Sequence, residues 1–140
     1  AVRSAGGAVT LDPSSPAAPV LVAEDDPRSL RMITLMFQSL GIPAVTVADG
    51  AAAIEALTPP DATFRAAVLD LQMPRANGVE VTRWIRAQEH TRTLPVVIVT
   101  AFAYPQDEAN ARAAGADHFL TKPLSLDILT ATMRAIEGGR

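Results

Sequence analysis

Five short apolar runs alternate along the chain with segments in which apolar residues recur at helical spacing. An uninterrupted apolar run is typical of a strand that is buried on both faces of a sheet. The run at 44–47 is the weakest of the five, and the first run is followed at once by three acidic residues. We therefore predict five strands, at residues 20–23, 44–47, 65–70, 95–100 and 117–121.

Helical periodicity follows each of these runs. The first helix has clear ends, because Asp26 is a suitable N-cap, Pro27 suits the first helical position and Gly41 stops the pattern. Further helices are predicted at 50–57, from 78 onward, at 106–114 and in the last segment, which ends at 138–139. The helix at 106–114 is nearly all alanine on its apolar side, so we expect it to pack loosely. The predicted core positions of the first, third and last helices are Leu30, Ile33, Phe37, Leu40, Val81, Trp84, Ile85, Leu126, Leu129, Met133 and Ile136.

Apolar strands that alternate with helices indicate a parallel sheet covered by helices on both faces. The segments between the strands are long enough for right-handed crossovers. The chain is therefore predicted to adopt a doubly wound α/β fold with a five-stranded parallel sheet. Ligands of such folds bind beyond the carboxyl ends of the strands, so the residues at those ends are the first candidates for a functional site.

Four of the five predicted strands end in residues that can carry chemistry. These residues are Glu24 and Asp25 after the first strand, Asp70 on the third, Thr100 on the fourth and Lys122 after the fifth. Taken singly, each has an ordinary explanation as a solvated loop acid, a strand residue or a surface charge. Together they would place three carboxylates at one edge of the sheet, which is costly without a cation. A hard divalent ion with oxygen ligands, in the first place Mg²⁺, would relieve the repulsion.

Composition narrows the class of protein. The chain has 140 residues, 49% hydrophobic and 19% charged, which fits one compact domain and excludes general disorder. The absence of cysteine excludes a disulfide scaffold, a thiolate metal site and a cysteine nucleophile. A net charge of −3 gives no reason to expect nucleic-acid binding, and no apolar run is long enough to span a membrane. Residues 1–19, rich in Ala, Gly, Ser and Pro, are predicted to be a linker or disordered tail before a cytoplasmic domain at 20–138.

A metal, a lysine and a hydroxyl at one edge suggest phosphate chemistry. Lys122 is the only lysine among twelve basic residues, and its ammonium is a compact counter-charge for phosphoryl oxygens. The chain has neither a Walker-type loop nor a dinucleotide-binding glycine motif, so no nucleotide is held by such a loop. The phosphate would then be bound by the metal, and an aspartate carboxylate is the natural covalent acceptor.

The chain resembles the receiver domain of two-component response regulators. The resemblance covers Val20 to about Glu137, and its motifs occur in order. They are Val22-Ala23-Glu24-Asp25-Asp26, Leu69-Asp70-Leu71-Gln72-Met73-Pro74 followed by Asn77-Gly78, Val99-Thr100-Ala101, and Leu120-Thr121-Lys122-Pro123. This resemblance implies a flavodoxin-like (βα)5 fold with the strand order 2-1-3-4-5.

The resemblance also implies a role for each residue of the acidic cluster. Asp70 would be the phosphoacceptor, and Asp25 would be a direct Mg²⁺ ligand. Glu24 stands where the family more often has Asp and would act largely through water. The main-chain carbonyl of Gln72 would be a third ligand, and Lys122 would pair with the phosphoryl group.

A conformational switch is implied as well. Thr100 would move its hydroxyl onto a phosphoryl oxygen, with the amide of Ala101 nearby. Phe119 would turn inward as Thr100 moves, and the peptide bond between Lys122 and Pro123 would be cis.

The implied function is a phosphorylation switch. A histidine kinase or a histidine phosphotransfer protein would give its phosphoryl group to Asp70. The face formed by the fourth helix, the fifth strand and the fifth helix would then change its affinity for partners, among them a second copy in a homodimer. No direct contact with nucleic acid or membrane is expected of this domain. The parent could be a free-standing regulator or a receiver fused to a sensor kinase, and the linker-like start slightly favours the fused form.

Two other classes remain as alternatives. A Mg²⁺-dependent phosphatase of the haloacid-dehalogenase type has a similar fold and also uses Asp, Thr and Lys, but it needs an Asp-x-Asp pair on the first strand. The candidate nucleophile here, Asp70, lies on the third predicted strand instead. A flavin-binding domain of the same fold is weaker still, because Glu24 and Asp25 would repel the phosphate of the cofactor.

Overall fold

The computed structural model describes residues 18–138, in which five strands alternate strictly with five helices. The strands are β1 (Val20–Ala23), β2 (Ala44–Val47), β3 (Ala66–Asp70), β4 (Val96–Thr100) and β5 (His118–Thr121). The helices are α1 (Pro27–Ser39), α2 (Gly50–Leu57), α3 (Gly78–Ala87), α4 (Pro105–Ala114) and α5 (Leu126–Gly138). Every element lies where the pattern of apolar residues predicts it.

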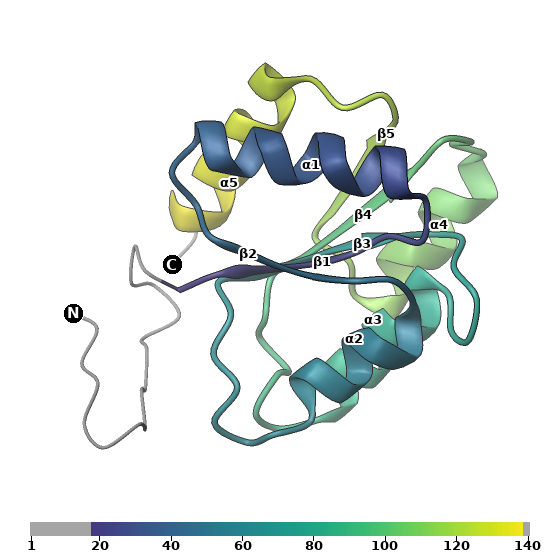
Figure 1. Ribbon diagram of the computed structural model, residues 1–140. Coiled ribbons are helices and arrows are strands. Elements are labelled where there is room, and N and C mark those ends of the chain that lie inside the picture. Colours follow the sequence, from purple (N-terminus) through teal and green to yellow (C-terminus); the bar gives the residue numbers. More distant parts are fainter. Residues whose placement is uncertain (1–17, 139–140) are drawn as a thin grey trace, which may run out of the picture.

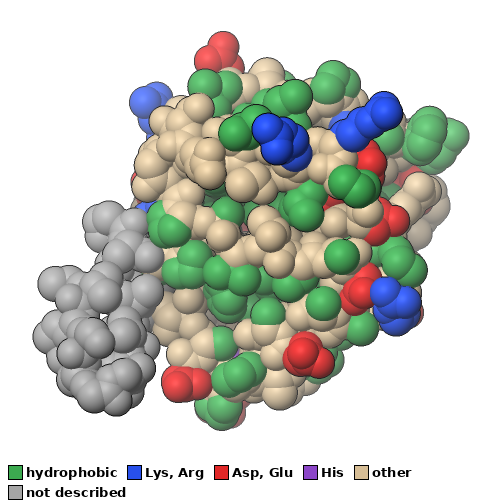
Figure 2. Space-filling model, viewed as in Figure 1, with side chains coloured by type: hydrophobic (Ala, Val, Ile, Leu, Met, Phe, Trp, Pro, Cys, Tyr) green, Lys and Arg blue, Asp and Glu red, His purple; other side chains and the backbone are tan. Residues whose placement is uncertain are grey.

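The strands form one parallel sheet in the order β2-β1-β3-β4-β5, which confirms the predicted fold. Helices α1 and α5 cover one face of the sheet, and α2, α3 and α4 cover the other (Figure 1). On the face shown in Figure 2, charged side chains of both signs are spread without a large patch of either sign. No helix among the described residues has both the length and the apolar character needed to cross a membrane.

Three strands and one helix begin one residue away from their predicted starts. β3, β4 and β5 each begin one residue later. At β4 the predicted first residue, Pro95, has no N–H to give to a ladder, and the side chain of Asp117 accepts the N–H of Val96 at 2.9 Å. α4 begins one residue earlier, because Pro105 has the fixed φ that suits the first helical turn.

Two layers of apolar side chains hold the helices on the sheet. On the α1–α5 face these include Ile33, Phe37, Leu129 and Met133. On the opposite face α3 contributes Val81 and Ile85, whereas α4 buries only Ala111. The loose packing predicted for α4 is thus confirmed. Four predicted core residues are partly or largely exposed, namely Leu30, Leu40, Trp84 and Leu126.

The predicted linker at residues 1–19 lies outside the described residues except for its last two. Ala18 is buried, and the carbonyl of Pro19 accepts a hydrogen bond from the N–H of Arg65 at 2.9 Å. The packed part of the chain therefore begins at least two residues before Val20.

Candidate functional site

The carboxyl ends of β1, β3 and β5 bring four charged side chains together. Glu24 and Asp25 follow β1, and Asp70 is the last residue of β3, the neighbour of β1 in the sheet. One carboxylate oxygen from each of these three acids lies within 4.8 Å of the others. Lys122 reaches the same place from the end of β5. Its Nζ donates to Glu24 Oε1 at 2.5 Å and to Asp70 Oδ2 at 3.4 Å.

The two acids after β1 have different environments. Glu24 is only 1% exposed, and both of its oxygens are used, since Oε2 accepts the N–H of Asp26 at 3.1 Å and Oε1 accepts from Lys122. Burial raises the pKa of Glu24, and the neighbouring Asp70 raises it further, while Lys122 opposes both. Asp25 is exposed. Of the two acids, Asp25 is therefore the one that an ion can reach from solvent.

The ammonium of Lys122 is held by the carboxylates around it. Burial alone would lower the pKa of Lys122, but Glu24 and Asp70 outweigh this effect and the pKa is raised. Three carboxylates still share one ammonium, so the cluster retains an excess of negative charge. Clustered oxygen donors of this kind fit a hard divalent cation. The peptide bond between Lys122 and Pro123 is cis, as the resemblance implied.

Thr100 and Ala101 lie at the same edge of the sheet, and Phe119 lies two residues before the end of β5, but all three make other contacts. Thr100 ends β4, the strand next to β3, and is buried. Its hydroxyl accepts the N–H of Phe102 at 3.2 Å and donates to the carbonyl of the same residue at 3.3 Å. Ala101 is exposed, and Phe119 is half-buried against the core on the α2–α3–α4 side. The structure thus brings the acids and the lysine together, while the threonine hydroxyl is bonded elsewhere.

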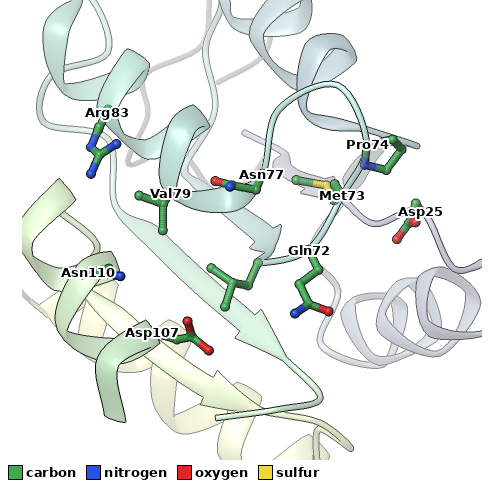
Figure 3. Close-up of a pocket in the computed structure, with 10 residues that line it drawn as sticks. Asp25, Gln72, Met73, Pro74, Asn77, Val79, Arg83, Asp107 and Asn110 are labelled. Carbon is green, nitrogen blue, oxygen red and sulfur yellow. The ribbon is translucent and has the colours of Figure 1, made fainter. Parts of the chain in front are cut away.

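A groove of about 640 Å³ extends from Asp25 past the loop after β3 to α3 and α4 (Figure 3). Its polar lining includes Gln72, Asn77, Arg83, Asp107 and Asn110. A second hollow, of about 360 Å³, is lined by Ala101, Lys122 and residues of α1. Asp25 lines the first of these hollows and Lys122 the second, and both residues belong to the same charged cluster.

The β3–α3 loop, residues 71–77, closes tightly over the end of β3. The N–H of Gln72 donates to Asp70 Oδ1 at 3.3 Å, and the N–H of Gly78 donates to the carbonyl of Leu71 at 2.9 Å. A Cβ on Gly78 would lie 2.7 Å from the carbonyl oxygen of Asp70, so this position requires glycine. Asn77 then begins α3 through a capping box with Glu80.

Sequence patterns did not reveal an ion pair beside this loop. Arg75 donates to Asp49 Oδ2 from Nη2 at 2.6 Å and from Nε at 3.1 Å, across 26 residues of sequence. Arg75 and Ala76 also have positive φ angles, 57° and 132°. Such conformations cost about 1–3 kcal/mol each in residues other than glycine. Neither residue type indicates a positive φ, so the strained segment could be found only from the structure.

Comparison with known proteins agrees with the geometry of the site. A family model described as the response regulator receiver domain matches residues 20–134. Among curated proteins, the polar-differentiation response regulator DivK of Brucella ovis is 28% identical over 121 residues, which cover 85% of this chain and 95% of that protein.

Solved structures give the same result. The receiver domain of a sensor histidine kinase from Pseudomonas aeruginosa PAO1, with a magnesium ion coordinated in its active site cleft, is 32% identical with a TM-score of 0.79, and the match covers 87% of this chain and 98% of that one. The signal receiver domain of a signal transduction histidine kinase from Syntrophus aciditrophicus is 27% identical with a TM-score of 0.79, covering 88% and 92%. None of these matches supports the haloacid-dehalogenase alternative. The matched region contains all five strands and the acidic cluster, and the chain belongs to the response regulator receiver domain family of two-component signal transduction.

Proposed function

We propose that Asp70 of this receiver domain accepts a phosphoryl group from the phosphohistidine of a histidine kinase or a histidine phosphotransfer protein. The observation that carries the proposal is the position of the Asp70 carboxylate. It shares a cluster with oxygens of Glu24 and Asp25, and it lies 3.4 Å from the ammonium of Lys122. A nucleophilic carboxylate beside a fixed cation is the arrangement that phosphoryl transfer to aspartate needs.

In this reaction a carboxylate oxygen of Asp70 attacks the phosphorus atom. The P–N bond to the histidine breaks, the imidazole leaves with the electron pair, and an acyl phosphate remains on Asp70. Lys122 would pair with the oxygens of the transferred group and neutralise their charge. Phosphoryl transfer asks little covalent chemistry of the protein, so positioning and charge account for most of the catalysis.

Mg²⁺ is the hard cation that suits carboxylates and phosphoryl oxygens together. Asp25 and Asp70 would hold it directly, and the main-chain carbonyl of Gln72 would be the third ligand. Glu24 would act through water, because its two oxygens are already used by Asp26 and Lys122. The bound ion supplies positive charge beside the phosphoryl oxygens. The magnesium ion in the Pseudomonas receiver supports this assignment.

Phosphorylation would be converted into a change of surface by three residues. Thr100 would transfer its hydroxyl from the backbone of Phe102 to a phosphoryl oxygen, beside the amide of Ala101. Phe119 would turn inward in response. The face of α4, β5 and α5 would then change its affinity for a partner protein or for a second copy of this chain. The shallow burial of α4, through Ala111 alone, supports movement on this face.

The wider setting of the domain is part of the same proposal. Two similar structures are receiver domains of histidine kinases, which supports a hybrid kinase as the parent chain. We propose that residues 20–138 are the signalling domain and that this domain lies in the cytoplasm, as its kinase partners do. We also propose that it makes no direct contact with nucleic acid or membrane.

Intact-mass spectrometry tests the acceptor. With Mg²⁺ and acetyl phosphate, the wild-type chain should gain one phosphoryl group and Asp70→Asn should gain none. Asp107→Asn is the matched control, because this carboxylate lines the same groove but lies outside the cluster, and it should react like the wild type. Asp25→Asn should weaken the dependence on Mg²⁺, because it removes an anionic ligand. If Asp70→Asn still gains a phosphoryl group, another residue is the acceptor.

A further inference from the structure

The β3–α3 loop is fixed close to the proposed phosphoacceptor at both of its ends. The N–H of Gln72 donates a hydrogen bond to Asp70 Oδ1 at 3.3 Å, and the N–H of Gly78 donates one to the carbonyl of Leu71 at 2.9 Å. The proposed function makes the carbonyl of Gln72 a metal ligand. The orientation of this short loop therefore decides whether that carbonyl can face the acidic cluster.

The apex of the loop adopts a conformation that its own residues disfavour. Arg75 and Ala76 are consecutive, and their φ angles are 57° and 132°. Side chains with a Cβ rarely occupy this region, which glycine adopts freely. Such a segment persists only where the surrounding structure imposes it, and in proteins it is concentrated at functional sites.

An ion pair from α2 holds this apex. Asp49 is the N-cap of α2, and its Oδ1 accepts the N–H of Ala52 at 2.7 Å. Its other oxygen, Oδ2, accepts both Nη2 and Nε of Arg75. The hydrogen bond from Ala52 and the guanidinium of Arg75 lower the pKa of Asp49, so the pair is charged at neutral pH. One carboxylate thus links the first turn of a helix to the strained loop.

The backbones of the two segments also touch. A Cβ placed on Gly50, the first residue of α2, would lie 2.0 Å from the carbonyl oxygen of Ala76. Only glycine allows this approach, and the ion pair lies directly beside it. The start of α2 therefore braces the loop through one backbone contact and one pair of charges.

We infer that Arg75 and Asp49 are positioning residues of the phosphorylation site. Their ion pair holds the strained β3–α3 loop so that the backbone of Gln72 faces Asp70 and the metal. This inference rests on the proposed function, because it assigns a role in presenting a metal ligand. If Arg75 acted only through its charge, its removal would have the opposite effect on Mg²⁺ affinity, since removing a nearby positive charge should tighten the binding of a cation. For substitutions of Arg75 the two explanations can therefore be separated by the direction of the effect, whereas loss of the Asp49 charge should weaken Mg²⁺ binding under both.

Three variants of the full chain test the inference by calorimetric titration with Mg²⁺. Arg75→Ala removes the ion pair but leaves a strained residue, and should weaken Mg²⁺ binding by about tenfold. Asp49→Asn removes the charge but can still cap α2, and should behave in the same way. Arg75→Gly also lacks the pair, but glycine adopts the positive φ without help, so it should recover most of the lost affinity.

A second measurement needs no metal. In the metal-free protein, hydrogen exchange of the Gln72 amide should be faster in Arg75→Ala than in the wild type, and near the wild-type rate in Arg75→Gly. Arg83→Ala is the control for charge, because this arginine lines the same groove from α3. It should not weaken Mg²⁺ binding and should leave the Gln72 amide unchanged.

The outcomes separate this inference from the proposed function. If Arg75→Ala binds Mg²⁺ as tightly as the wild type or more tightly, the inference is wrong but the proposed function is unaffected. The ion pair would then be only a stabilising contact. Equal losses in Arg75→Ala and Arg75→Gly would also overturn it, since strain would then play no part. If the wild-type chain binds no Mg²⁺, both the proposed function and this inference are wrong.

Discussion

Glu24 shows at the scale of one residue how burial separates two neighbouring acids. Its carboxylate is almost inaccessible and divides its oxygens between the backbone of Asp26 and the ammonium of Lys122. Removing only one partner of a buried pair leaves the other charge uncompensated. Glu24 is therefore the residue that holds Lys122 beside Asp70, and the exposed Asp25 is the acid that we propose as the direct ligand of the ion.

The carboxylate of Asp49 makes folding stability depend on pH. The N–H of Ala52 and the guanidinium of Arg75 lower its pKa below the ordinary value of 3.8. A group whose pKa is lowered by folding stabilises the fold above its unfolded pKa, and the contribution is lost as the pH falls through the folded-state value. We expect Asp49→Asn to have a smaller free energy of unfolding than the wild type at neutral pH.

The difference in free energy of unfolding between the wild type and Asp49→Asn should shrink as the pH falls through 3.8 and below, because Asp49 then becomes protonated in the wild type. Urea denaturation at a series of pH values measures this difference. A difference that stays constant over the whole range would show that the charge of Asp49 is not its source.

Residues of the site differ in how far the sequence reveals them. Asp70, Thr100 and Lys122 could be predicted because each ends a strand or directly follows one, and parallel strands end at the same edge of a sheet. Arg75 and Asp49 could not, because 26 residues separate them and their contact depends on a loop whose positive φ angles occur in an arginine and an alanine.

At the scale of secondary structure, the two ends of α4 are held differently. At the C-terminal end, Arg86 of α3 donates to the carbonyl of Gly115 from Nε and Nη2, at 3.1 and 2.8 Å. It also contacts Asp117 Oδ2 at 3.0 Å. At the N-terminal end, Tyr104 caps the helix without a side-chain hydrogen bond. α4 is therefore anchored where it leads to β5 and least restrained at its start, on the side of the proposed phosphorylation site.

The anchor can be removed by a single substitution. Arg86→Ala should lower the free energy of unfolding by about 1–3 kcal/mol, because carbonyl groups that Arg86 satisfies lose their donors. Arg112→Ala is the control on α4 itself, because its pair with Glu108 and its hydrogen bond to the carbonyl of Asp117 at 3.2 Å are both exposed, and an exposed pair is worth less than about 1 kcal/mol. Urea denaturation compares the two variants, and hydrogen exchange over residues 105–117 should speed up in Arg86→Ala. If the two variants lose the same free energy of unfolding, Arg86 does not anchor α4 more strongly than an exposed ion pair does.

All ten elements could be predicted from periodicity, because local apolar spacing decides which segments become strands and helices. The order of the strands came from the resemblance to a family, since spacing alone does not say which strands are neighbours. The anchoring of α4 was beyond prediction, because Arg86 and Gly115 lie 29 residues apart and meet only after both helices have packed.

At the scale of the whole molecule, α4 packs more weakly on the sheet than the helices of the opposite face do. α1 and α5 bury large side chains such as Phe37 and Leu129, whereas α4 buries a single alanine, Ala111. Burying a large apolar side chain stabilises a helix by about 1.5–3 kcal/mol, several times more than one methyl group. A change at the proposed phosphorylation site should therefore move α4 more readily than α1 or α5.

We propose that the link from the site to α4 runs through the hydroxyl of Thr100. In the structure this hydroxyl is bonded to the N–H and the carbonyl of Phe102, at the start of a loop whose Phe102 and Tyr104 side chains are 57% and 62% exposed. In this proposal, a phosphoryl group that captures the hydroxyl would break these bonds and would then leave Phe119 the space to turn inward. Regulatory couplings of this kind amount to about 1–3 kcal/mol, which a loosely packed helix can absorb.

Hydrogen exchange should therefore be fastest, among residues 18–138 of the unphosphorylated protein, between Phe102 and Ala114. Beryllofluoride with Mg²⁺, which stands in for the phosphoryl group, should slow exchange over this segment. Thr100→Ala should still be phosphorylated but should lose most of this protection, whereas Thr100→Ser keeps a hydroxyl and should retain it. Protection limited to the residues that touch Asp70, with 102–119 unchanged, would mean that the signal does not leave the site through α4. In that case the weak packing of α4 would have no part in signalling.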